Sequence, residues 1–122
     1  KMSLEVSVNE DFILVELKEG LDISEIRRGL TRLFYIPEFI DKNDIWVFHE
    51  GVINLSHDDL YKLRDIIQET YPKETKANKT ALVVKSDEQL NMAEAFVQIG
   101  KDLPYEFRIF SNLQDAKDWI TA

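Results

Sequence analysis

The feature that most constrains the fold of this chain is a regular alternation between short apolar segments and longer segments with one apolar stripe. Residues 45–48 (Ile-Trp-Val-Phe) and 80–84 (Thr-Ala-Leu-Val-Val) are short and almost wholly apolar, which is typical of strands buried on both faces of a sheet. Between such segments, apolar residues recur every three or four positions, as on one face of an α-helix. Strands that alternate with helices predict right-handed crossovers and a mostly parallel sheet covered by helices.

The chain opens with a predicted β-hairpin. Leu4, Val6 and Val8 alternate with polar residues, as in a half-buried strand, and a polar turn separates them from a second apolar segment. A hairpin pairs its strands antiparallel, so the sheet is expected to be mixed. The sequence therefore predicts an α/β fold with about five strands and four flanking helices, in the order β-β-α-β-α-β-α-β-α. The strands are expected at residues 4–8, 12–17, 45–48, 80–84 and 105–110, and the helices within residues 22–36, 56–71, 87–100 and 112–120.

Short polar side chains mark the expected helix starts. A side-chain oxygen just before a helix can accept hydrogen bonds from the unpaired backbone N–H groups of the first turn. Ser56, followed three residues later by Asp59, is similar to a capping box with aspartate in place of glutamate. Asp87 and Asn112 are expected to cap the third and fourth helices, and a proline ends each of the first two.

The composition argues against several classes of function. The 122 residues suffice for one domain, expected to span residues 2–122, and 44% of them are hydrophobic. The chain has no cysteine, which excludes disulfides, thiolate catalysis and cysteine-ligated metals. A net charge of −8, without a run of Lys or Arg, argues against nucleic-acid binding. No apolar run is long enough to cross a bilayer and no signal pattern is present, so the expected compartment is cytoplasmic.

Several stretches in the C-terminal half resemble a known family. They are residues 80–84 with 91–96 (Asn-Met-Ala-Glu-Ala-Phe), residues 103–110 (Leu-Pro-Tyr-Glu-Phe-Arg-Ile-Phe), and the closing pattern of Leu113, Ala116, Trp119 and Ile120. With the N-terminal hairpin, they resemble the SpoIIAA-like family of small bacterial proteins, which is grouped with the STAS domains of anti-sigma-factor antagonists and with SEC14-type domains. The resemblance implies a STAS-like fold and brings no catalytic residues. It leaves monomer and homodimer open and slightly favours the homodimer.

The resemblance also makes Ser56 a phosphoacceptor candidate. In STAS regulators a partner kinase phosphorylates a serine at the start of the helix after the central strand, and Ser56 is the nearest equivalent here. A phosphate at this position would meet unpaired N–H groups and the positive end of the helix dipole. Asp58 and Asp59 would repel it. The alternative is that Ser56 serves only as an N-cap.

Two histidines flank one predicted strand-to-helix loop. His49 and His57 lie there with Glu50, Asp58 and Asp59, and such groups can hold a divalent metal or exchange protons near neutral pH. No pair has a recognised ligand spacing and no nucleophile accompanies them, so the sequence predicts no metal, cofactor or catalytic residue. The loop follows the carboxyl end of a strand, where α/β proteins commonly bind ligands. His49 and His57 therefore stay candidates for a ligand or partner surface.

The connection around Pro37 is more apolar than a surface loop ought to be. Tyr35, Ile36, Phe39 and Ile40 could form an exposed patch for a protein partner or a small apolar ligand. The more common outcome for such a segment is that it folds down and closes the edge of the core.

The expected function is binding without catalysis. The leading hypothesis is a binding or regulatory domain with an unidentified protein partner, similar to anti-sigma-factor antagonists. The alternative is a domain that binds a small molecule or a lipid, which the kinship with SEC14-type domains and the apolar residues 35–40 suggest.

Overall fold

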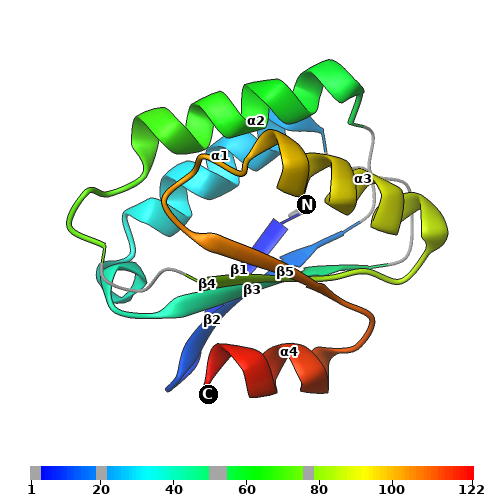
Figure 1. Ribbon diagram of the computed structural model, residues 1–122. Helices are drawn as coiled ribbons and strands as arrows, with labels where there is room; N and C mark the ends of the chain where they lie inside the picture. The colour runs from blue at the N-terminus through cyan, green and yellow to red at the C-terminus, as the bar shows by residue number, and fades with distance from the viewer. Residues whose placement is uncertain (1–3, 19–21, 50–54, 76–78) are drawn as a thin grey trace.

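Five strands form a mixed sheet whose spatial order follows the chain. They are β1 (Leu4–Val8), β2 (Phe12–Leu17), β3 (Asn43–Phe48), β4 (Lys79–Val83) and β5 (Glu106–Phe110). The computed structural model describes residues 4–18, 22–49, 55–75 and 79–122. β1 and β2 pair antiparallel, and each later strand pairs parallel with the one before it (Figure 1). The predicted α/β class, with a mixed five-stranded sheet and four helices, is confirmed.

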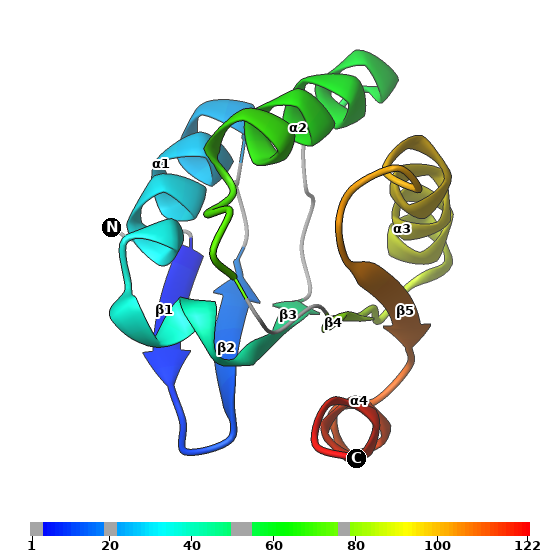
Figure 2. The same ribbon diagram turned by 60° about the vertical axis from the view of Figure 1, so that its left-hand side comes forward.

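Three of the four helices cover the same face of the sheet. α1 (Ile23–Phe34), α2 (His57–Thr70) and α3 (Asp87–Ile99) each connect two parallel neighbours, and all three lie above the sheet in Figure 1. This follows from the strand order, because right-handed crossovers that advance one strand at a time in one direction place every helix on one side. α4 (Leu113–Ile120) lies alone on the opposite face, against β3, β4 and β5 (Figure 2).

The connection between α1 and β3 contains an element that the sequence did not predict. Pro37–Ile40 form a short 3₁₀ helix, η1. Proline occupies its first position, where the missing N–H leaves no hydrogen bond unmade. β3 then begins at Asn43, two residues before the expected start at residue 45. The expected strand included only the apolar residues 45–48, whereas the first two residues of β3 are polar.

The helix starts follow the predicted capping pattern, with one correction. Ser56 and Asp59 form the expected capping box: the Ser56 Oγ accepts from the Asp59 N–H at 3.2 Å, and the Asp59 carboxylate accepts from the Ser56 N–H at 3.0 Å. Asn112 caps α4 as expected. The expectation that Asp87 caps α3 is wrong, because Ser86 is the N-cap and Asp87 is the first helical residue.

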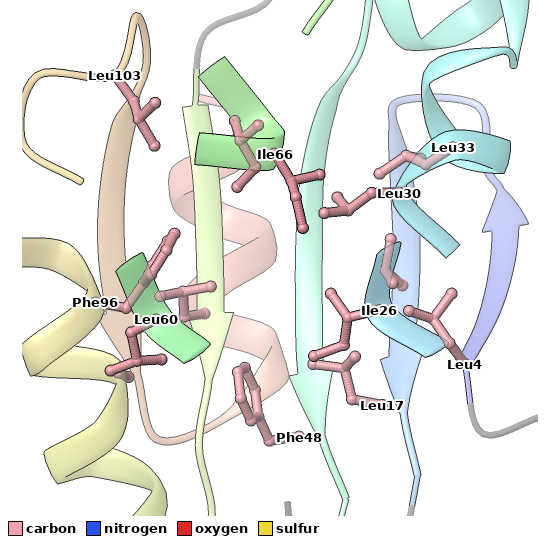
Figure 3. Packing of buried hydrophobic residues seen from close by; sticks show 14 of the residues in the cluster. Leu4, Leu17, Ile26, Leu30, Leu33, Phe48, Leu60, Ile66, Phe96 and Leu103 are labelled. Atoms are coloured by element: carbon pink, nitrogen blue, oxygen red, sulfur yellow. The ribbon is translucent and has the colours of Figure 1, made fainter. Parts of the chain in front are cut away.

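The sheet has an apolar core on each face, which is why the central strands read as continuously apolar. On the α4 side, Ile45, Val47, Ala81 and Val83 from β3 and β4 pack against the helix. On the other side, the larger core lies beneath α1, α2 and α3. In Figure 3, Leu17 and Phe48, which are partners in the β2–β3 register, lie side by side in this larger core. None of the described helices is long and apolar enough to cross a lipid bilayer.

Replacing Ser56 with alanine should destabilise the fold. Alanine cannot accept the hydrogen bond from the Asp59 N–H, and loss of an N-cap oxygen costs about 1 kcal/mol of unfolding free energy. Urea denaturation of the wild type and Ser56→Ala measures the difference. Ser111→Ala is the control, because Ser111 is exposed and its hydroxyl bonds to no described residue. Equal stability of Ser56→Ala and the wild type would contradict the capping role.

Candidate functional site

The structure does not bring the two histidines together into a chemical site. His49 follows β3, and its Nε2 lies 2.9 Å from the Glu16 Oε1 of the neighbouring strand. His57 is the exposed first residue of α2, where its ring packs against Tyr61. Glu50 lies outside the described residues. Among the residues that the structure describes, no three His, Asp or Glu side chains are placed to hold a metal ion.

Ser56 is exposed at the start of α2, and its hydroxyl oxygen is engaged in the capping box. Asp58 and Asp59 occupy the first turn of the helix beside it. A phosphoryl group on Ser56 would lie close to the carboxylates of Asp58 and Asp59, which would repel it. In the structure, Ser56 acts as the N-cap of α2.

The apolar segment around Pro37 divides between surface and core. Tyr35 is 82% exposed, Ile36 and Ile40 are partly buried, and Phe39 is buried with 3% exposure. The Phe39 ring contacts Phe34 at a centroid distance of 5.0 Å. The segment thus has one exposed aromatic side chain, Tyr35, and one buried in the core, Phe39.

Phe39 lines a cavity of about 70 Å³ that lies between the sheet and the three helices above it. Side chains from all four parallel strands, all three helices and η1 contribute to its wall, and most are apolar. The wall includes Leu30 and Leu33 of α1, Leu63 of α2, and Ala93 of α3. The cavity is therefore part of the larger core and not a surface groove.

One end of this cavity is polar, and the carboxyl group of Asp44 lies at the centre of this polar end. The side chain is 7% exposed. Its Oδ2 accepts a hydrogen bond from the indole Nε1 of Trp46 at 2.6 Å, and its Oδ1 accepts one from the Thr80 hydroxyl at 2.9 Å. Both donors are neutral. The buried carboxyl group is thus well hydrogen-bonded, and no positively charged side chain among the described residues forms an ion pair with it.

The geometry of the sheet explains how these three side chains meet. Successive residues of a strand point to opposite faces, so Asp44 and Trp46 lie on the same face, two positions apart on β3. Thr80 of β4 is the partner of Asp44 in the parallel register. The polar cluster is therefore held by strand pairing and does not depend on loop conformation.

Two tyrosines close the same end of the cavity. Tyr71 follows α2 and Tyr105 precedes β5, and their rings stack at a centroid distance of 4.9 Å. Tyr71 also contacts Phe34 and Phe39 edge-on, and Tyr105 contacts Phe107. A continuous set of aromatic rings thus runs from the end of α1 to β5.

The ionisation of these groups follows from their burial. Loss of hydration raises the pKa of Asp44 from its ordinary 3.8 to about 6, although the bonds from Trp46 and Thr80 oppose this rise. Burial first, and then the charge of Asp44, raise the pKa of Tyr71 to about 12. The same causes raise the pKa of Tyr105 well above its ordinary value. At neutral pH the site holds one carboxylate and two neutral phenols.

This cluster lies at the amino ends of the parallel strands. Asp44 is the second residue of β3 and Thr80 the second of β4. His49 and His57, the candidates expected from the sequence, lie at the opposite edge, where α/β sheets commonly bind ligands. The signal in the sequence that could have indicated the cluster is the polar pair Asn43-Asp44, directly before the apolar residues 45–48.

The described wall of the cavity determines which chemical groups are available there. Its described wall offers a hydrogen-bond acceptor with a negative charge, hydroxyl groups and aromatic rings. It contains no His, Cys or Lys among the described lining residues that could act as a nucleophile or as a second titrating partner near neutral pH.

Replacing Asp44 with asparagine should remove a pH dependence of stability. The raised pKa means that the folded protein binds a proton that the unfolded chain releases between about pH 4 and 6. The unfolding free energy of the wild type therefore falls as pH rises through this window, by about 3 kcal/mol in total. Asparagine does not ionise, and its amide can accept from Trp46 and donate to Thr80.

When the pH is raised from 4.5 to 7.5, we expect the unfolding free energy of Asp44→Asn to rise by about 2 kcal/mol relative to that of the wild type. Urea denaturation at both pH values measures this gain. Asp11→Asn removes an exposed carboxylate and is the control, which should show no such gain. A stability difference between Asp44→Asn and the wild type that is equal at both pH values would refute the assigned ionisation.

Comparison with known proteins identifies no relative: the chain matches no protein-family model, no curated protein and no solved structure.

Proposed function

We propose that this chain is a binding domain that holds a small, largely apolar molecule in the cavity between the sheet and α1, α2 and α3. The observation that carries the proposal is the combination of an apolar cavity with a buried carboxyl group at one end. Natural ligand pockets share this design, in which apolar walls supply affinity and a few placed polar groups fix the orientation. A core without a ligand has no need of an ionisable group that lowers its own stability.

The volume of the cavity limits the size of its occupant. About 70 Å³ is roughly half of the 150 Å³ in an engineered protein cavity that takes up benzene. The molecule is therefore about four non-hydrogen atoms in size, or a larger ligand enters with only its end group and the helices move outward to admit the rest. The first case needs no rearrangement and is the one that we test.

The fold assignment that accompanies this proposal is STAS-like, of the SpoIIAA-like kind. Its support is the element order and the N-terminal hairpin, together with three connecting helices on one face and α4 on the other. Within that group, the kinship with SEC14-type domains fits a protein that shelters an apolar ligand. The cavity next to Phe39 favours this ligand-binding role over the regulatory one.

The regulatory alternative, a phosphorylation switch at Ser56, receives less support. The Ser56 oxygen is occupied as a helix cap, and two aspartates follow it in the first turn. We therefore propose ligand binding as the function and do not assign an enzymatic activity.

Filling the cavity should abolish ligand binding and leave the fold intact. Ala93 of α3 lines the cavity, and Ala93→Leu places additional carbon atoms in its volume. The neighbouring Glu94 is exposed, so Glu94→Leu adds apolar bulk outside and is the matched control. Urea denaturation checks that both variants remain folded.

Native mass spectrometry of protein purified gently from its own cells gives the readout. The wild type and Glu94→Leu are expected to carry additional mass that is lost on denaturation, and Ala93→Leu is expected to lack it. Equal additional mass on a folded Ala93→Leu would place the ligand elsewhere. The absence of additional mass from every variant, with no binding of small apolar probes, would refute the proposed function.

A further inference from the structure

We infer that the ligand of this cavity is a small alkylammonium ion, whose positive charge pairs with the Asp44 carboxylate while its alkyl group occupies the apolar part. This inference rests on the proposed function and adds the chemical class of the ligand. Its basis is the arrangement of charge around a buried cavity.

Asp44 is the only charged side chain among the described residues that line the cavity. Its hydrogen bonds come from an indole, a hydroxyl group and its own backbone N–H, and none of these donors carries charge. In the described parts of the chain, no Lys, Arg or His lies within ion-pair distance of it, whereas the carboxylate of Glu16 has His49 at 2.9 Å. A negative charge in an apolar interior is costly unless a positive charge accompanies it. The cavity next to Asp44 is where that charge can be placed.

The carboxylate retains the capacity to accept a further donor. Its two oxygens together offer about four lone-pair positions, of which the two side-chain donors and the backbone N–H of Asp44 use three. An ammonium group has only donors and matches such an acceptor. The resulting hydrogen bond between opposite charges is about twice as strong as one between neutral groups.

Aromatic rings also surround this end of the cavity, and a cation that reaches their faces would be attracted to them. Trp46, Tyr71 and Tyr105 line the wall with Asp44. The faces of indole and phenol rings attract positive charge, and this attraction increases where water is excluded. An anion would meet both the carboxylate and these rings unfavourably. A neutral alcohol could donate to Asp44 but would leave its charge uncompensated.

Among the described residues that line the cavity, Asp44 is the group that should make the binding depend on pH. The titratable groups that face it are Tyr71, at the end of α2, and Tyr105, before β5, while β2 and β4 contribute Ile13 and Thr80 in the same register. Both phenols stay neutral near pH 7, because burial raises their pKa values. An alkylammonium ion keeps its proton throughout this range, as a lysine side chain does. Affinity should therefore fall as the pH is lowered and Asp44 takes up a proton.

The test compares three probes of four non-hydrogen atoms each: isopropylammonium, propan-2-ol and acetate. Each is titrated into the ¹⁵N-labelled protein, and dissociation constants are taken from the amide chemical shifts of residues around the cavity. At pH 7.5 we expect isopropylammonium to bind at least about tenfold more tightly than propan-2-ol, and acetate not to bind. Lowering the pH to 5.5 should weaken the binding of isopropylammonium about fourfold and leave the binding of propan-2-ol unchanged.

Asp44→Asn should remove the preference for the ammonium ion and its pH dependence while propan-2-ol still binds. Asp11→Asn, which removes a remote exposed carboxylate, should behave as the wild type does. If Asp44→Asn does not fold, the pH dependence of the wild type decides the question. Tighter binding of propan-2-ol or acetate than of isopropylammonium would overturn the inference and leave the proposed function standing. Failure of all three probes to bind would overturn both.

Discussion

The order of the strands is the constraint on which the rest of this structure depends. Because each strand from β2 to β5 lies beside its predecessor in the chain, three connecting helices must share one face of the sheet. Their apolar faces meet above the middle strands, and the side chains between them leave a cavity of about 70 Å³. Among the described elements, α4 alone covers the opposite face, where its residues Leu113, Ala116, Trp119 and Ile120 pack in the smaller core.

The polar end of the cavity opposes the stability of the core that contains it. A carboxyl group with 7% exposure gives up most of its hydration, and the two neutral donors return only part of that loss. The pKa of Asp44 is raised because these hydrogen bonds do not fully replace the lost hydration. Buried ionisable groups are common at the binding sites of natural proteins, where a ligand of opposite charge can replace the stabilisation that the group loses with its hydration.

Much of the fold could be predicted from the sequence because its determinants are local. The alternation in β1, the helical stripes and the capping box of Ser56 and Asp59 each lie within one short segment. The capping residue of α3 was misassigned because Ser86 and Asp87 are adjacent and both can cap. The cavity could not be predicted, since it joins Asp44 to Thr80 across 36 positions through a strand register that no local pattern specifies.

The two halves of the polar site belong to different kinds of structure. Asp44, Trp46 and Thr80 are fixed on paired strands, whereas Tyr71 and Tyr105 lie just outside a helix end and a strand start. A small displacement of α2 would carry Tyr71 with it and leave the carboxylate in place. Under the proposed function, substitutions around Tyr71 and Tyr105 would thus change the length of the ligand, while Asp44, Trp46 and Thr80 would keep the preference for a positive charge. Related chains could in this way diverge in ligand size and still retain one rule of recognition.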